Sequence, residues 1–241
     1  RVPYAGYNAG KAGSFKNTSD RLRKDLSGHA DVAMRELFVG GNENIDAILI
    51  YLISYIDKKI LNDNILMPVM SCRGLEGTAL TGEKLKEHLM KKCIQTGGVN
   101  FEKDYEVAVQ NLFEGKGLLL VNGIEGFLIL MIGGGQERQI SEPETEKRIR
   151  GTREGFIEDI WVNIGMIRKF VKDPLLQVEV IKVGKRTKTD VAIVYIEGVA
   201  DPRIVEEVKT RIGRIKIDSI LSSGYIEQYI EDNPWSVFPQ L

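Results

Sequence analysis

Gly184 and Lys185 raise the first chemical question, because a glycine–lysine pair is the core of a common phosphate-binding loop. Such a loop needs G-x-x-x-x-G-K-[ST], so that backbone N–H groups wrap the anion and a hydroxyl reaches the metal ion. Here Glu179 occupies the place of the first glycine, and Arg186 follows the lysine in place of Ser or Thr. The next element is expected to be an apolar strand, so no helix N-terminus would face an anion. Gly184 is therefore interpreted as a turn glycine.

The chain has two histidines and two cysteines, residue types that often bind transition metals. His29 and His88 have no cysteine or acidic neighbours at ligand spacing, so no metal site is expected. Cys72 and Cys93 are far apart and are interpreted as reduced thiols of a cytosolic protein, not as a disulfide framework. Neither a nucleophilic serine motif nor a dinucleotide fingerprint is present. The sequence therefore predicts no catalytic residue, no metal and no cofactor.

Composition narrows the class of protein. The 241 residues are 43% hydrophobic and 28% charged, which is ordinary for a folded protein and enough for one large or two small domains. A formal net charge of -1 argues against a dedicated nucleic-acid binder, which usually has a strong basic excess. No stretch reaches the roughly 18 apolar residues of a membrane span.

An internal repeat organises the chain. When the sequence is shifted by 144 positions, residues 39–60 align without gaps on residues 183–204, with six identities in 22 positions. One apolar strand aligns on the other, and Asp57 aligns on Asp201, each just before an expected helix. Each half then has the order helix, strand, turn, strand, helix.

We therefore expect an α/β fold of two related subdomains, each a small mixed β-sheet packed with helices. Residues 1–18 are expected to be a flexible basic tail, 19–135 the N-terminal subdomain, 136–150 a connector and 151–241 the C-terminal subdomain. Within them, the patterns predict strands over 31–39, 45–56, 118–121, 127–132, 175–183 and 189–196, and helices over 19–27, 57–66, 81–92, 104–113, 152–171, 201 onward and 225–231.

Two groups of basic residues have open interpretations. Lys185, Arg186 and Lys188 in the second turn either contact acidic lipid headgroups or an acidic partner, or form a solvated hairpin tip that discourages edge pairing. Arg148, Arg150 and Arg153 in the connector either bind a carboxylate ligand or pair with the nearby glutamates.

The last residues are aromatic and rich in proline. Trp235 and Phe238 lie between Pro234 and Pro239, with polar turn residues around them. We expect these aromatic side chains either to fold back onto their own domain or to contact a partner or a membrane, because exposed aromatic groups are unfavourable in water.

Three segments carry a family resemblance. PETEKRIRGTREGFIEDI (143–160), VGKRTKTDVAIVYIEGVADP (183–202) and SGYIEQYIEDNPWSVFPQ (223–240) resemble the A subunit of GerA-type spore germination receptors. The resemblance is strong over residues 143–241 and weaker but collinear from about residue 20. Thr152 and Val237 depart from the family pattern, which usually has proline at both positions; both are local backbone preferences.

The resemblance implies the N-terminal soluble region of a polytopic membrane protein, followed by transmembrane helices. It also implies a place in the spore inner membrane with this region on the core, cytoplasmic side, B and C subunits as partners, and a nutrient such as an amino acid or sugar as germinant. No enzymatic residues are implied. We expect small-ligand sensing or signal coupling; a structural role in holding subunits together, with self-association, is the alternative, and an unrecognised cytosolic enzyme is a second rival.

Overall fold

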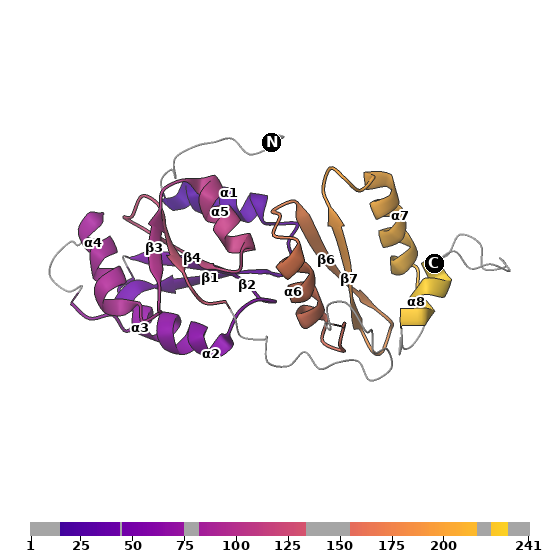
Figure 1. The fold of residues 1–241 in the computed structure, drawn as a ribbon, viewed down its shortest axis with the longest axis horizontal. Helices are drawn as coiled ribbons and strands as arrows, with labels where there is room; N and C mark the ends of the chain where they lie inside the picture. Colours follow the sequence, from indigo (N-terminus) through magenta and orange to yellow (C-terminus); the bar gives the residue numbers. More distant parts are fainter. Residues whose placement is uncertain (1–14, 44, 75–81, 134–154, 216–222, 231–241) are drawn as a thin grey trace, which may run out of the picture. The chain divides into compact units, whose positions relative to one another are not determined.

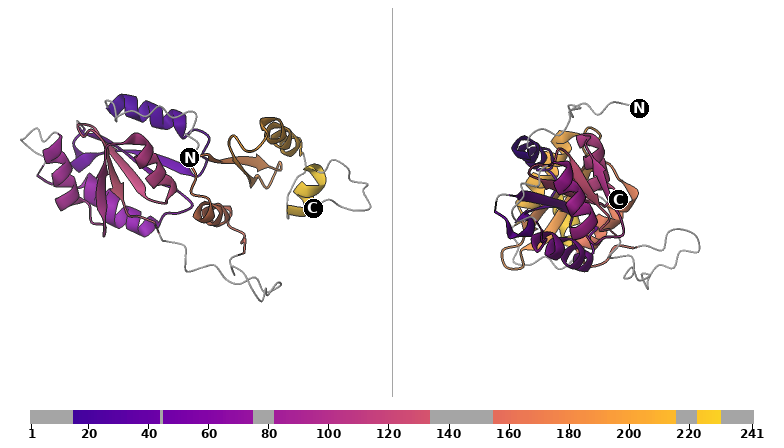
Figure 2. Two further views of the ribbon diagram at one scale, coloured as in Figure 1. Left: turned by 45° about the horizontal axis from the view of Figure 1, so that its top comes forward. Right: turned by 90° about the vertical axis from the view of Figure 1, so that its left-hand side faces the viewer.

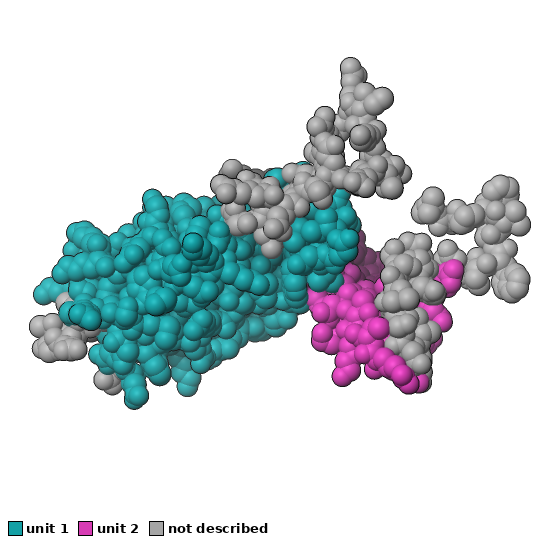
Figure 3. Space-filling view, turned by 90° about the horizontal axis from the view of Figure 1, so that it is seen from below, with its two compact units in different colours: residues 1–174 teal, residues 175–241 magenta. Residues whose placement is uncertain are grey.

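A computed structural model describes residues 15–43, 45–74, 82–133, 155–215 and 223–230 (Figure 1). The chain divides into two compact units, residues 1–174 and 175–241, which are coloured separately in Figure 3. The α/β class expected from the sequence is confirmed.

Unit 1 contains a five-stranded sheet with the strand order β1-β2-β4-β5-β3. Every neighbouring pair in this sheet is antiparallel. The central strand β4 is buried along its whole length, which agrees with its uninterrupted apolar sequence. The strands are β1 (Val32–Phe38), β2 (Asp46–Leu52), β3 (Val99–Glu102), β4 (Gly117–Val121) and β5 (Phe127–Leu130).

Helices cover both faces of this sheet (Figures 1 and 2). Alternate residues of β2 point to opposite faces, so Ile48 and Ile50 pack with α1 and α5, whereas Leu49 packs with the helices of the other face. The first face carries α1 (Phe15–Asp25) and α5 (Tyr105–Phe113). The second carries α2 (Lys58–Ile60), the π-helical segment η2 (Leu61–Leu66), α3 (Met67–Met70), α4 (Glu83–His88) and the π-helical segment η3 (Leu89–Cys93).

Unit 2 is a hairpin of β6 (Leu176–Val183) and β7 (Thr189–Ile196) with two helices, α7 (Pro202–Gly213) and α8 (Ser223–Ile230). A small apolar cluster centred on Val183, Ile212 and Ile215 joins α7 to one face of the hairpin. The side chain of Asp201 caps α7 by accepting a hydrogen bond from the Arg203 N–H, as the sequence predicts.

The internal repeat is visible in the strand register. Adding 144 to both members of the Val32–Leu52 pair in the first hairpin gives the Leu176–Ile196 pair of the second. Each hairpin is preceded by a helix and followed by a helix capped by an aspartate, Asp57 or Asp201. The first hairpin extends into five strands, whereas the second remains two-stranded among the described residues.

The structure differs from expectation at the boundary between the halves. The helix expected over 152–171 is α6 (Ile160–Phe170), and its cap is Asp159, whose carboxylate accepts from the Trp161 and Val162 N–H groups. Thr152, the first residue of that expected helix, lies outside the described residues, as do residues 1–14 of the expected tail and the whole connector 136–150. Residues 15–18, which were expected to belong to the flexible tail, form the first turn of α1 instead. By its contacts α6 belongs to unit 1, not to the second half of the repeat.

The two cysteines also differ from expectation. Cys72, just after α3, and Cys93, at the end of η3, are joined by a disulfide, so their interpretation as reduced thiols was wrong for this structure. They are 21 positions apart in sequence, but packing of α3 against η3 brings their Cα atoms to 5.5 Å. Such a distance suits a disulfide.

Candidate functional site

The sequence-predicted contact residues Lys185, Arg186 and Lys188 form the exposed tip of the β6–β7 hairpin. We call these three residues the basic tip. Gly184 has a φ of 90° and Lys188 a φ of 46°, so the chain reverses here through left-handed conformations. A strand follows, so no helix N-terminus faces an anion, and the interpretation of Gly184 as a turn glycine is confirmed.

The charge of the basic tip is not neutralised by the strands beside it. Lys182 pairs with Asp190 across the hairpin at 2.7 Å. Within the part of the chain that the structure describes, no ion pair involves Lys185, Arg186 or Lys188, so three positive charges lie together on one turn. The equivalent turn of the first hairpin, Val39–Gly41, has no basic residue. The positive charge is thus a property of the second hairpin and not of the repeat.

A polar network beneath the hairpin fixes α7 to it. The Tyr195 hydroxyl donates to Glu179 Oε1 at 2.7 Å, and Lys209 Nζ of α7 lies 2.8 Å from the same oxygen. Burial raises the pKa of Glu179, but the hydrogen bonds from Lys209 and Tyr195 outweigh it and the net pKa is lowered. Hydrogen bonding to Glu179 and Glu206 raises the pKa of Lys209.

Burial, followed by the hydrogen bond to Glu179, raises the pKa of Tyr195 to about 12. At neutral pH the tyrosine is therefore protonated, the lysine charged and the glutamate ionised. None of these groups is poised to exchange a proton near pH 7, so the network serves as a clamp. This clamp was not predicted from the sequence, although the alternation of the strands places Glu179 and Tyr195 on one face.

A second buried polar group anchors α6 within unit 1. Arg168 and Asp31 are both completely buried, and the guanidinium binds the carboxylate through Nε at 2.8 Å and Nη2 at 3.0 Å. Arg168 also donates to His29 Nδ1 at 3.2 Å and lies over the Phe113 ring. The sequence offered one signal for this contact, since Arg168 lies four positions after Ile164 on the apolar stripe of α6.

A shallow hollow of about 460 Å³ lies at the start of α1. Its lining includes one lysine and one carboxylate, Lys16 and Asp46, together with Phe15, Ser19 and Asn122. This arrangement offers one charge of each sign to a small polar molecule. The sequence-predicted ligand residues Arg148, Arg150 and Arg153 lie outside the described residues, as do Trp235 and Phe238.

Nearly the whole chain matches one known protein family. Residues 20–241 match the model of the family described as Bacillus/Clostridium GerA spore germination protein. The chain belongs to the GerA family. The resemblance expected from three sequence segments is therefore confirmed, and it extends over nearly the whole chain.

Curated relatives of this chain include spore germination protein KA of Bacillus subtilis, which is 35% identical over 226 residues, covering 94% of this chain and 40% of the relative. The uncharacterized membrane protein YfkQ of the same organism is 35% identical, with 95% of this chain and 43% of the relative covered. GerLA of Bacillus cereus is 31% identical, with 95% and 45% covered. The chain thus spans less than half the length of these relatives.

A solved structure shares the fold. The crystal structure of the N-terminal domain of the A subunit of the Bacillus megaterium spore germinant receptor GerK3 matches with a TM-score of 0.71 and 27% identity. The match covers 97% of this chain and 85% of that one. In this GerA-family chain, no described helix combines the length and the apolar character that a membrane crossing requires.

Proposed function

We propose that this chain is the N-terminal domain of a germinant receptor subunit and that it couples a nutrient signal to a membrane region of the same receptor. The observation that carries the proposal is the match along 97% of the chain to the N-terminal domain of a germinant receptor A subunit. The expected membrane region is supported by two relatives that are more than twice as long as this chain, one of which is named a membrane protein. The proposal places the domain on the core side of the spore inner membrane, with B and C subunits as partners, and assigns it no catalysis.

The basic tip is the part of the domain that we expect to make the coupling contact. Its three cations lie on a short hairpin that the Glu179–Tyr195–Lys209 clamp fixes to α7. A fixed cationic projection suits an acidic surface, either anionic lipid headgroups or an acidic face of a partner subunit. Aromatic residues Trp235 and Phe238 would assist such a contact if the chain continues into a membrane region.

The test is nutrient-triggered germination of spores that carry the full-length receptor with the basic tip reversed in charge, K185E/R186E/K188E. We expect a slower or absent response at an unchanged receptor level, because the changed side chains are all exposed. The matched control is K58E/K59E, which reverses two exposed lysines at the start of α2 in unit 1. A normal response of the basic-tip variant would overturn the coupling role.

Direct sensing of the nutrient is a finer proposal that the hollow between Lys16 and Asp46 favours, since an amino acid carries both complementary charges. Titration calorimetry of the domain with the receptor's amino acid and sugar germinants tests it. We expect one nutrient to give a heat of binding, and we expect K16E to lose it. The control is K24E, which changes a lysine farther along α1 and should bind like the wild type. No heat and no melting shift with any germinant would reject sensing by this domain.

A scaffold role is supported by a different observation. Met67 and Met70 on α3 are 67% and 43% exposed, which offers an apolar face to a second protein molecule. Light scattering across a concentration series measures self-association, and M67E should abolish it. If the domain forms oligomers and the basic-tip variant germinates normally, the scaffold role is favoured over coupling.

A further inference from the structure

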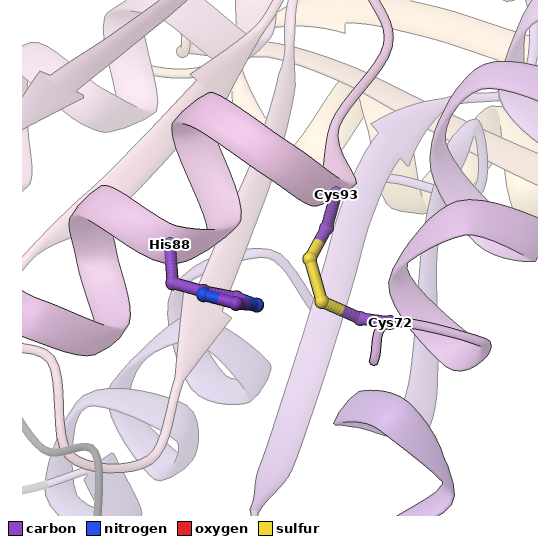
Figure 4. A group of neighbouring side chains, drawn as sticks. All are labelled: Cys72, His88 and Cys93. Atoms are coloured by element: carbon purple, nitrogen blue, oxygen red, sulfur yellow. A yellow bond between two sulfur atoms is a disulfide. The ribbon is translucent and has the colours of Figure 1, made fainter. Parts of the chain in front are cut away.

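Three side chains with metal-binding atoms meet on the second face of the unit 1 sheet (Figure 4). They are Cys72 after α3, His88 at the end of α4 and Cys93 at the end of η3. One ligand atom from each lies within 4.8 Å of the other two. Both cysteines are buried and His88 is half-buried, so the cluster is closed on the core side and accessible on the histidine side.

The π-helical segment η3 explains why His88 and Cys93 face one another. In an α-helix, residues five apart are about 140° apart around the axis, so such a pair does not share a face. In η3 the backbone closes a wider turn, and the Ile94 N–H donates to the Leu89 carbonyl, five residues earlier, at 2.9 Å. The wider turn places His88 and Cys93 on one side. Ordinary helical spacing therefore did not reveal the pair in the sequence.

The segment after Cys72 holds the imidazole in place. His88 Nε2 donates to the Arg73 carbonyl oxygen at 2.9 Å. A Cβ atom at Gly74, which has a φ of 84°, would lie 3.3 Å from His88 Cε1, so the backbone passes close to the ring. Backbone carbonyls commonly orient the histidines that bind metals in this way. Because Nε2 carries the proton donated to the carbonyl, Nδ1 is the nitrogen left to bind a metal ion. Figure 4 shows the ring edge directed towards the two sulfur atoms.

We propose that Cys72, Cys93 and His88 form a Zn²⁺ site when the two cysteines are reduced. Two thiolates and one imidazole bind zinc more tightly than magnesium or calcium, which bind oxygen ligands instead. Tetrahedral Zn–S bonds of about 2.3 Å require sulfur atoms about 3.8 Å apart. The Cα separation of 5.5 Å allows this by side-chain rotation. The fourth position is open to water or to an external ligand.

The disulfide and the zinc site are two states of the same cysteines. Reduction adds two electrons and two protons to the disulfide and gives two thiols; the electrons come from a thiol or phosphine reductant, which is itself oxidised by two electrons. Binding of Zn²⁺ then displaces both thiol protons, because the thiolate is the ligand. Either state links α3 to η3. This inference does not depend on the proposed role in germination.

The test uses the full chain reduced with a phosphine, loaded with Zn²⁺, freed of excess metal and analysed for metal content. We expect about one zinc per chain in the reduced wild type and none in the unreduced protein or in C72S/C93S. H88Q should weaken zinc binding roughly tenfold or more, since even the loss of a residue that only orients a ligand costs about that much. K84Q, an exposed change on the same α4 helix, is the matched control and should bind like the wild type.

Substitution of Co²⁺ for Zn²⁺ gives a spectroscopic check, because tetrahedral cobalt with thiolate ligands absorbs in the visible and near ultraviolet. If the cysteine variants do not fold, the rate of cysteine alkylation is measured in the reduced wild type with and without zinc. Bound zinc should slow the modification of both cysteines. A reduced wild type that retains no zinc, or unchanged alkylation with zinc present, would overturn the site. Equal zinc affinity of H88Q and wild type would overturn the role of His88 as a ligand.

Discussion

The buried pair of Arg168 and Asp31 gives the sharpest prediction for stability. We consider Arg168→Met, which keeps most of the side-chain volume but removes the charge and every donor. Asp31 would then remain fully buried without its bidentate partner, and Nδ1 of His29 would lose the hydrogen bond from Arg168. The lost contact is the one that joins α6 to the residue just before β1.

The expected cost is about 3–5 kcal/mol of unfolding free energy, which is typical when one member of a buried ion pair is removed. Domains of this size are stable by only about 5–15 kcal/mol, so the variant should be close to unfolding at physiological temperature. Replacing both partners, as R168M/D31L, should cost less than R168M alone. No uncompensated carboxylate is then left in the core.

Urea unfolding followed by circular dichroism measures these differences, with R168M, D31L and the double variant forming a thermodynamic cycle. The control is Arg23→Met, which breaks the exposed pair of Arg23 with Glu36 and should cost less than about 1 kcal/mol. A cost below about 1 kcal/mol for R168M would refute the reasoning. So would a double variant whose loss equals the sum of the two single losses, because the two side chains would then not be coupled.

Other predictions concern backbone contact and titration. Gly165→Ala should destabilise unit 1 by about 1–3 kcal/mol, because the new Cβ would lie 2.5 Å from the Ser54 carbonyl oxygen. Gly213→Ala, at the end of α7, should instead stabilise by about 0.4–1 kcal/mol, because nothing lies within 4 Å; thermal melts of both variants compare them. Tyr195 should titrate at a pKa of about 12, above its unfolded value near 10, so its contribution to stability is complete below pH 10 and is lost as pH rises through 12. Tyrosinate absorbance measured against pH should show the ionisation of Tyr195 near pH 12, and Y195F should remove it. Ionisation of all tyrosines in one step near pH 10 in the wild type would contradict the clamp with Glu179.

Most elements of the fold could be predicted from local patterns. The apolar runs predicted β2, β4 and β5, and the aspartates Asp57 and Asp201 marked the starts of the helices that follow the two hairpins. The shift of 144 positions predicted a repeat that the strand register then matched. Strand β3 was missed, because its sequence, VNFE, is short and half polar and becomes a strand only by pairing with β5.

The candidate site was predicted in part. The basic tip lies where the glycine and the following charges indicated a turn, because turn chemistry is local. The clamp of Glu179, Tyr195 and Lys209 was not predicted, since it needs the packing of α7 against the hairpin. Membership of the GerA family was predicted from three segments and confirmed by the family match.

The sequence by itself thus determined the order of elements, the repeated hairpins, the turn at the basic tip and the family. Each of these can be read from the residue patterns of short continuous segments, singly or compared with one another. Only the tertiary structure decided which distant side chains meet. Arg168 and Asp31 are 137 positions apart, and Cys72 meets Cys93 and His88 only because α3 packs against η3 and η3 adopts a π-helical turn. The physical reason is that such contacts depend on how layers pack around the sheet, and no local periodicity records that packing.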